Sequence, residues 1–195
     1  MQLVFATNNL NKLKEVQALI PSNIKLLSLK DIGCFDDIPE TQNTIEGNAI
    51  QKVEYVKNKY NYNCFADDTG LEVEVLKGAP GVYSARYAGP QKNATDNMNK
   101  LLTALKDNTN RNGQFKTVVA LHLNNKTETF TGICKGKITK TKQGEKGFGY
   151  DPIFKPNGYN ETFSEMELDL KNKIGHRGKA ITKLVAFLKT IEPKN

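Results

Sequence analysis

The feature that most limits the fold is a pair of long strand-like stretches separated by three polar residues. QFKTVVALHL covers residues 114–123, TETFTGICKGKIT covers residues 127–139, and NNK lies between them. Runs rich in β-branched and aromatic residues with a short asparagine-containing connection predict a β-hairpin. The chain therefore contains at least one antiparallel strand pair.

Upstream of the hairpin, strand and helix patterns alternate. Strands are predicted at LVFAT (3–7) and IKLLSL (24–29), and helices at NKLKEVQALI (11–20), before Pro21, and at about 44–60 behind Thr44. A strand, a turn and a second strand are predicted at CFADDTGLEVEVL (64–76). A helix capped by Thr95 is predicted at ATDNMNKLLTALKD (94–107), and a final helix at about 179–190. This order predicts one α/β domain over residues 1–195 with a mixed β-sheet flanked by helices.

Composition limits the function classes. The chain has 195 residues and a net charge of +7, with lysines spread along its length. A basic balance suits phosphate-bearing small molecules, although nucleic acid stays possible. No apolar run approaches the roughly 18 residues of a membrane span, and the start lacks a signal-peptide pattern, so we expect a cytoplasmic protein. Cys34, Cys64 and Cys134 are widely spaced and predict plain thiols, with neither zinc nor disulfides.

The loop ATNNLNK, residues 6–12, lies between the first strand and the first helix. A helix start offers backbone N–H groups to an anion, and Thr7, Asn8, Asn9 and Lys12 add donors and a charge. The motif G-x-x-x-x-G-K-[ST] is absent. The loop is either a phosphate site or an ordinary capped helix start.

Acidic residues form a second candidate site. Asp67 and Asp68 are adjacent in ADDTG, and in a strand their side chains would point to opposite faces. Mg²⁺ needs only one or two carboxylates plus water and phosphate oxygens, so one aspartate with Glu40 or Glu46 would suffice. The alternatives are a turn at Asp-Thr-Gly and solvated glutamates.

Two stretches near the C-terminus suggest a base-binding site. In GFGYDPIF, residues 147–154, Phe148 can offer a ring face to a base and Asp151 can accept a hydrogen bond. In KNKIGHRGKA, residues 171–180, lysine and arginine supply donors that favour a keto oxygen over an amino group. The alternatives are a packed turn and a solvated basic face.

Several motifs together carry a family resemblance. FATNNLNKLKE, DDTGLEV, GAPGVYSARYAG, FGYDPIF, FSEM and GHRGKA follow one another over nearly the whole chain. With them the chain resembles the inosine triphosphate pyrophosphatase family, also called Ham1-like. The resemblance implies Mg²⁺-dependent hydrolysis of ITP, dITP and XTP to the monophosphate and pyrophosphate. It also implies a cytosolic homodimer, with two lobes and a central cleft, that requires no nucleic acid.

The resemblance also implies roles for individual residues. Asp68 corresponds to the general base and a metal ligand, and Glu40 to the other metal-site acid. The substrate-binding positions are Thr7, Asn8, Asn9, Leu10, Asn11, Lys12, Lys52, Thr69, Phe148, Gly149, Tyr150, Asp151, Lys171, His176 and Arg177. Thr69 replaces a frequent serine and keeps the hydroxyl, whereas Gly175 replaces the serine that usually precedes His176. The alternative function is a non-catalytic nucleotide- or RNA-binding module, which would not need Glu40 and Asp68.

Overall fold

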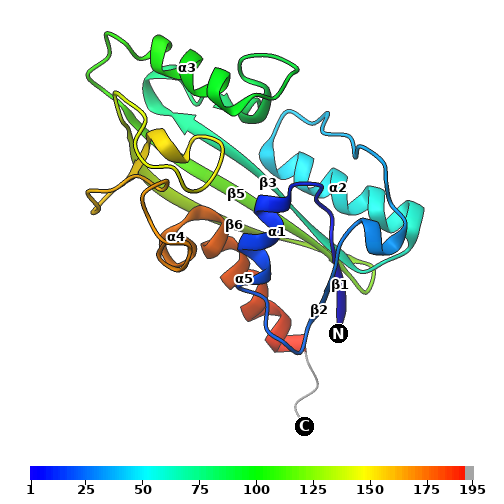
Figure 1. Cartoon of the computed structure of the whole chain (residues 1–195). Coiled ribbons are helices and arrows are strands. Elements are labelled where there is room, and N and C mark those ends of the chain that lie inside the picture. Colours follow the sequence, from blue (N-terminus) through cyan, green and yellow to red (C-terminus); the bar gives the residue numbers. More distant parts are fainter. Residues whose placement is uncertain (192–195) are drawn as a thin grey trace. The chain divides into compact units, whose positions relative to one another are not determined.

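A computed structural model describes residues 1–191 (Figure 1). The helices are α1 (Leu10–Gln17), α2 (Ile45–Tyr60), α3 (Ala94–Ala104), α4 (Leu168–Ile174) and α5 (His176–Ile191). The strands are β1 (Gln2–Phe5), β2 (Lys25–Leu27), β3 (Cys64–Val73), β4 (Pro80–Gly81), β5 (Asn112–Leu123), β6 (Lys126–Ile138) and β7 (Phe154–Pro156). The predicted α/β class is confirmed.

The strands form a mixed sheet in the order β2-β1-β3-β5-β6-β7, and β4 pairs with β3. β1 runs parallel to β2 and to β3, whereas β3–β4 and β6–β7 are antiparallel. The predicted hairpin is present as β5 and β6. Its turn residues Asn124 and Asn125 have φ values of 50° and 62°, the left-handed conformation that two-residue hairpin turns require and that asparagine tolerates.

The chain divides into two compact units, each with its own core. Unit 1 comprises residues 1–68, 117–132 and the segment from 177 onward, and unit 2 comprises residues 69–116 and 133–176. In unit 1, apolar residues of α1 and α5 pack with β1, β3 and β5 around Phe5 and Phe65, whose rings stack 4.7 Å apart. In unit 2, α3 packs with Phe115, Phe154 and Phe163. The prediction of one domain over residues 1–195 stays a prediction.

The prediction of strand, turn and strand for residues 64–76 is wrong. β3 continues without a break from Cys64 to Val73, and a short 3₁₀ helix, Glu74–Leu76, follows it. Asp67 and Asp68 are buried within the strand and their carboxylates bind other side chains. Turn-forming aspartates instead bond their own backbone, so tertiary contacts overrode the local turn preference here.

Helices α3 and α5 also differ in detail from the sequence prediction, and two short elements were not predicted. Asn93, not Thr95, caps α3, because its side chain accepts a hydrogen bond from the amide of Asp96. α5 begins at His176, three residues before the predicted start at about 179, and α4 and β7 were not predicted. α4 has 7 residues and no side-chain cap bond, so it carries little of the periodic signal by which helices are found.

Cys34, Cys64 and Cys134 are free thiols and all three are buried. Within residues 1–191, no helix is long and apolar enough to cross a membrane.

Candidate functional site

Two carboxylates of unit 1 meet at the side chain of Lys52. The Lys52 Nζ atom lies 2.8 Å from Glu40 Oε1 and 3.5 Å from Asp68 Oδ1, and it donates to the Asp67 carbonyl at 2.7 Å. Glu40 comes from the loop before α2, Lys52 from α2 and Asp68 from β3. The structure thus brings two acids that are distant in sequence to the same cation.

Helix α2 positions this cluster. Its N-cap Thr44 accepts a hydrogen bond from the Gly47 amide, which fixes where the helix begins. Asn48 and Lys52 are one helical turn apart and therefore share a face. Asn48 Nδ2 donates to Asp68 Oδ2 at 3.3 Å, and Asn48 Oδ1 accepts from the Gln42 amide at 2.9 Å. Asn48 therefore holds the Asp68 carboxylate and also ties down the loop that carries Glu40.

Asp67 forms a separate buried network with residues of α1 and α5. Its carboxylate lies 3.0 Å from Lys12 Nζ and 2.8 Å from Arg177 Nε, and Arg177 Nη1 also pairs with Glu15. The Asp67 side chain is fully buried, whereas that of Asp68 is 11% exposed. The two adjacent aspartates thus have different partners and different access to solvent.

The electrostatic surroundings distinguish these groups further. Burial would raise the pKa of Asp67, but the nearby charges of Lys12 and Arg177 outweigh it, so this pKa is lowered. Burial raises the pKa of Asp68, and the attraction of Lys52 offsets this only in part. Burial would lower the pKa of Lys52, but Asp68, Glu40 and Asp67 together raise it. Burial lowers the pKa of Lys12, against the opposing effect of Asp67.

The start of α1 is a capped helix end in this structure. Asn9 Oδ1 accepts from the amides of Asn11 at 2.9 Å and Lys12 at 3.2 Å, and Thr7 Oγ1 accepts from the Asn9 amide. Asn8 Nδ2 donates to the Asp36 carbonyl. A phosphate that used the amides of Asn11 and Lys12 would have to displace the Asn9 side chain. Leu10 is 71% exposed beside them.

A second cluster lies in unit 2 around Asp151. The Asp151 carboxylate accepts from Lys171 Nζ at 2.6 Å and from the Phe148 amide at 2.7 Å. Lys171 Nζ lies 4.8 Å from the centre of the Phe148 ring, a cation–π distance. Asp151 is only 3% exposed, and its carboxylate is already hydrogen-bonded to Phe148 and Lys171. The hydrogen bond expected from a base or sugar to Asp151 stays a prediction.

Four more predicted substrate residues lie in unit 2. Tyr150 is buried and donates to the Ser84 carbonyl at 2.9 Å, and burial raises the pKa of its phenol. His176 is buried and stacks on Phe115, with ring centres 4.4 Å apart. Gly149 has a φ of 65°, which favours glycine in the turn after Phe148. Thr69, on β3, is partly exposed.

Arg177 lies in unit 1, where it binds Glu15 and Asp67. The sequence analysis grouped it with Lys171 as a donor to a base, but here two carboxylates hold its guanidinium. Glu15 and Asn48 contribute to these clusters and were not predicted. Glu15 is 5% exposed in a helix that otherwise reads as amphipathic, and no local signal separates it from a solvated glutamate.

Gly175, the position where the family usually has serine, is shaped by the end of α4. Its amide donates to the Lys171 carbonyl at 2.8 Å. A Cβ atom at position 175 would lie 2.5 Å from that same carbonyl oxygen, closer than real Cβ atoms approach. A serine would therefore require the α4 terminus, which carries Lys171, to shift.

Glu40 and Asp68 fit a divalent cation. Within residues 1–191 no group of three or more His, Cys, Asp or Glu side chains forms a closed metal cage. Mg²⁺ does not need one, because it keeps water and phosphate oxygens among its ligands. The two carboxylates already converge on one positive charge, the Lys52 ammonium, so this donor set is suited to a hard cation.

The fold and the clusters define an α/β protein with buried acids and lysines in unit 1 and an aromatic–cation cluster in unit 2. The model of the Ham1 family matches residues 3–187. The chain belongs to the Ham1 family, which confirms the resemblance carried by its motifs.

Curated relatives and solved structures agree with this assignment. The chain is 63% identical over 188 residues to a dITP/XTP pyrophosphatase of Flavobacterium johnsoniae, covering 96% of this chain and 98% of that protein. It is 65% identical over 189 residues to the protein of that name from Flavobacterium psychrophilum, covering 97% and 100%. The Staphylococcus aureus Ham1 protein superposes with a TM-score of 0.89 at 38% identity, over 97% of this chain and 99% of that one.

Proposed function

We propose that this chain hydrolyses deaminated purine nucleoside triphosphates, namely ITP, dITP and XTP, to the monophosphate and pyrophosphate. The observation that carries the proposal is the convergence of Glu40 and Asp68 on Lys52, with Asp67 and Lys12 alongside in unit 1. A binding module would not need this acid pair. The names of the relatives, dITP/XTP pyrophosphatase, support the substrate class.

The lysines and acids of unit 1 act on the triphosphate. Lys12 and Lys52 attract the phosphate oxygens, and Glu40 and Asp68 hold Mg²⁺. When bound, the metal supplies positive charge that stabilises the negative charge developing on the phosphate oxygens. Asp68 orients a water molecule and takes one of its protons. The water oxygen bonds to the α-phosphorus, the bond from that phosphorus to the bridging oxygen breaks, and pyrophosphate leaves.

The raised pKa of Asp68 suits the role of a base. A carboxylate that burial has made more basic accepts a proton more readily than a solvated one. Asn48 keeps the carboxylate in place through its 3.3 Å hydrogen bond. Asp67 is the poorer base, because Lys12 and Arg177 lower its pKa and its side chain is fully buried. We therefore assign the catalytic role to Asp68 and a positioning role to Asp67, which holds Lys12.

The cluster in unit 2 recognises the base. The Phe148 ring stacks on the purine, and Lys171 donates to the 6-keto oxygen that hypoxanthine and xanthine share. Adenine has an amino group at that position and offers no acceptor there. Asp151 fixes the positions of the Lys171 ammonium and the Phe148 amide, because its carboxylate accepts from both. Since Arg177 is engaged with Glu15 and Asp67, Lys171 carries this recognition in unit 2.

A pyrophosphate-release assay tests the proposal. With Mg²⁺ and ITP or XTP the chain should release pyrophosphate, whereas ATP should be a poor substrate. Asp68→Asn should lower kcat by a factor of about 10² to 10⁴. A protein that binds ITP without cleaving it, and whose binding weakens steeply with salt, would instead be the non-catalytic nucleotide- or RNA-binding module.

The remaining features of the proposal are Mg²⁺ as the particular metal, a homodimer, a single functional domain over residues 1–195, a location in the cytoplasm and no requirement for nucleic acid. Light scattering of the purified chain at micromolar concentration decides the oligomeric state. Replacement of Mg²⁺ by Ca²⁺, which has a looser coordination geometry, decides whether a compact octahedral ion is needed.

A further inference from the structure

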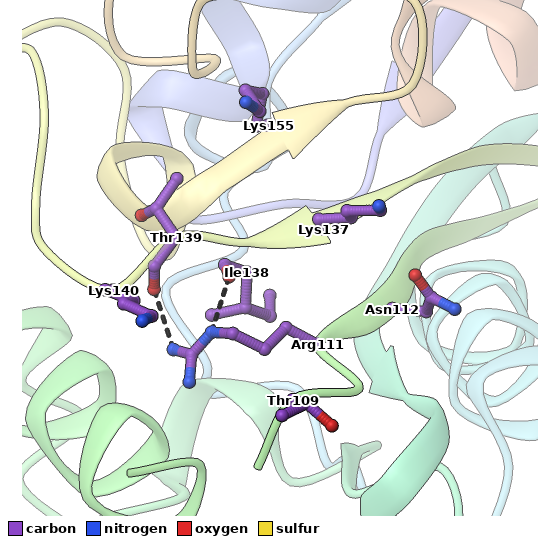
Figure 2. A pocket seen from close by; sticks show the side chains of 8 residues that line it. All are labelled: Thr109, Arg111, Asn112, Lys137, Ile138, Thr139, Lys140 and Lys155. Atoms are coloured by element: carbon purple, nitrogen blue, oxygen red, sulfur yellow. Dashed lines mark hydrogen bonds between the residues drawn. The ribbon is translucent and has the colours of Figure 1, made fainter. Parts of the chain in front are cut away.

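Unit 2 contains a hollow of about 320 Å³ where β5 begins and β6 ends. Figure 2 shows the side chains that line it. They are Thr109, Arg111, Asn112, Lys137, Ile138, Thr139, Lys140 and Lys155. Four of these eight residues are cationic and none is acidic. None of them belongs to the clusters around Lys52 or Asp151.

Arg111 forms a fixed floor for this hollow. Its Nε and Nη2 atoms donate to the carbonyls of Ile138 and Thr139, each at 2.8 Å, as the dashed lines in Figure 2 mark, and Nη1 donates to the Leu105 carbonyl at 2.6 Å. These acceptors are neutral. Burial lowers the pKa of the guanidinium, and no carboxylate is among the causes that act on it. Three carbonyls therefore hold this positive charge in place, and no ion pair joins it to a carboxylate within residues 1–191.

Three lysines add positive charge to the lining. Lys137 and Lys155 lie directly opposite each other in the antiparallel β6–β7 pair, where like charges repel. Lys140 follows β6 two residues beyond its end at Ile138. No ion pair joins any of these lysines to a carboxylate within residues 1–191. Glu74 contacts the lining residue Asn112 and accepts from its Nδ2 at 3.2 Å.

We propose that this hollow binds a small, multiply charged phosphate anion, of the class of inorganic triphosphate. Its volume lies at the lower end of the roughly 300–1,000 Å³ typical of small-molecule pockets. An anion there would bridge Lys137 and Lys155, relieve their repulsion and meet the charge of Arg111. A nucleic-acid site would need cations that continue along a groove, whereas these are confined to one pocket. The proposal is independent of the proposed hydrolytic function.

The test measures anion binding at this hollow separately from binding at the Lys12–Lys52 cluster. Inorganic triphosphate is titrated into the ¹⁵N-labelled chain without divalent metal, and the amide signals of Ile138, Thr139 and Lys140 are followed. The variant Lys137→Gln/Lys140→Gln is compared with Lys77→Gln/Lys92→Gln, an equal loss of charge from exposed lysines of unit 2 outside the lining. The first variant should weaken binding reported by these amides about tenfold, and the control should not.

The variant should hydrolyse ITP at the wild-type rate, because neither lysine belongs to the proposed reaction site. Equal weakening in both variants would mean that general charge is responsible and would overturn the proposal. So would amide signals that do not move with triphosphate. A single-stranded oligonucleotide that moves these signals at lower concentration than triphosphate would also overturn it and identify a nucleic-acid surface.

Discussion

At the scale of single residues, the adjacent aspartates Asp67 and Asp68 differ in burial and in the direction of their pKa shifts. Asp67 is fully buried between Lys12 and Arg177, and their charges lower its pKa. Asp68 is 11% exposed, and burial raises its pKa despite Lys52. The folded state therefore favours the ionised form of Asp67 and disfavours that of Asp68. Asp67 contributes to stability through its charge, whereas the charge on Asp68 is retained at a cost in stability.

Asparagine substitutions at the two positions should affect stability and turnover differently. Asp67→Asn leaves Lys12 and Arg177 without their shared counter-charge and should cost about 3–5 kcal/mol, which lowers the melting temperature by on the order of 10 °C. Asp68→Asn replaces a disfavoured charge with a neutral amide, so its melting temperature should stay within about 3 °C of wild type. Thermal melts measure both, and ITP turnover is the companion measurement. Equal destabilisation, or full turnover by Asp68→Asn, would contradict the assignment.

Cys64 gives a prediction with a definite pH dependence. Its thiol is fully buried and donates to the Val53 carbonyl, and burial raises its pKa to about 12. Because the thiolate is the reactive form, its native-state alkylation by iodoacetamide should be negligible at pH 8 and rise about tenfold per pH unit toward that pKa. Mass spectrometry of the Cys64 peptide measures the rate. The same peptide from urea-unfolded protein is the control, and rapid labelling of the native protein at pH 8 would contradict the prediction.

At the residue scale, a motif marks a position in the sequence, whereas a remote contact partner leaves no local signal. The sequence singled out Lys12, Asp68 and Lys171, and the structure places each in a charged cluster. It did not single out Glu15, because the contact with Arg177 spans 162 positions. Nor did it show that Asp151 holds Lys171 and the Phe148 amide, because a carboxylate's hydrogen-bond partners depend on tertiary packing.

At the scale of elements, local patterns predicted helices with strong periodicity or a cap. α2 begins after the predicted Thr44, and Asn48, Lys52 and Val56 recur on its buried face. The pattern failed at β3, where Asp-Thr-Gly favours a turn but the carboxylates have partners on either side of a continuous strand. It also missed α4, whose short length gives too few turns to show a period.

The end of α4 should be sensitive to the residue at position 175. Gly175→Ser places a Cβ within 2.5 Å of the Lys171 carbonyl oxygen, so the helix end must move. Overpacking of this kind costs about 1–3 kcal/mol, or roughly 2–12 °C in melting temperature. Because Lys171 moves with it, KM for ITP should rise. Lys173→Ala, at an exposed position of α4, is the control and should change neither. An unchanged melting temperature for Gly175→Ser would show that the turn accepts a side chain.

At the scale of the whole molecule, the clusters are divided between units with separate cores. The acids and Lys52 lie in unit 1, and Phe148, Asp151 and Lys171 lie in unit 2. The sequence predicted the mixed sheet and the hairpin, because alternation and turn residues are local. Local patterns do not show the division into two cores, because the boundary falls within β3, β5 and β6, where the strand patterns continue unbroken. The expectation of two lobes came from the family resemblance.

This division predicts that losses of function in the two units multiply. Phe148→Leu removes the stacking ring, worth about 1–3 kcal/mol, and should raise KM for ITP about tenfold with kcat little changed. Asp68→Asn should lower kcat with KM little changed. The contacts described for Asp68, with Asn48 and Lys52, do not overlap with those of Phe148. Effects at sites without shared partners add in free energy, so kcat/KM of the double variant should fall by the product of the single losses.

Steady-state kinetics with ITP measures all four proteins, with Phe148→Tyr, which keeps the ring, as the matched control. A double variant no worse than Asp68→Asn alone would show that Phe148 acts through Asp68.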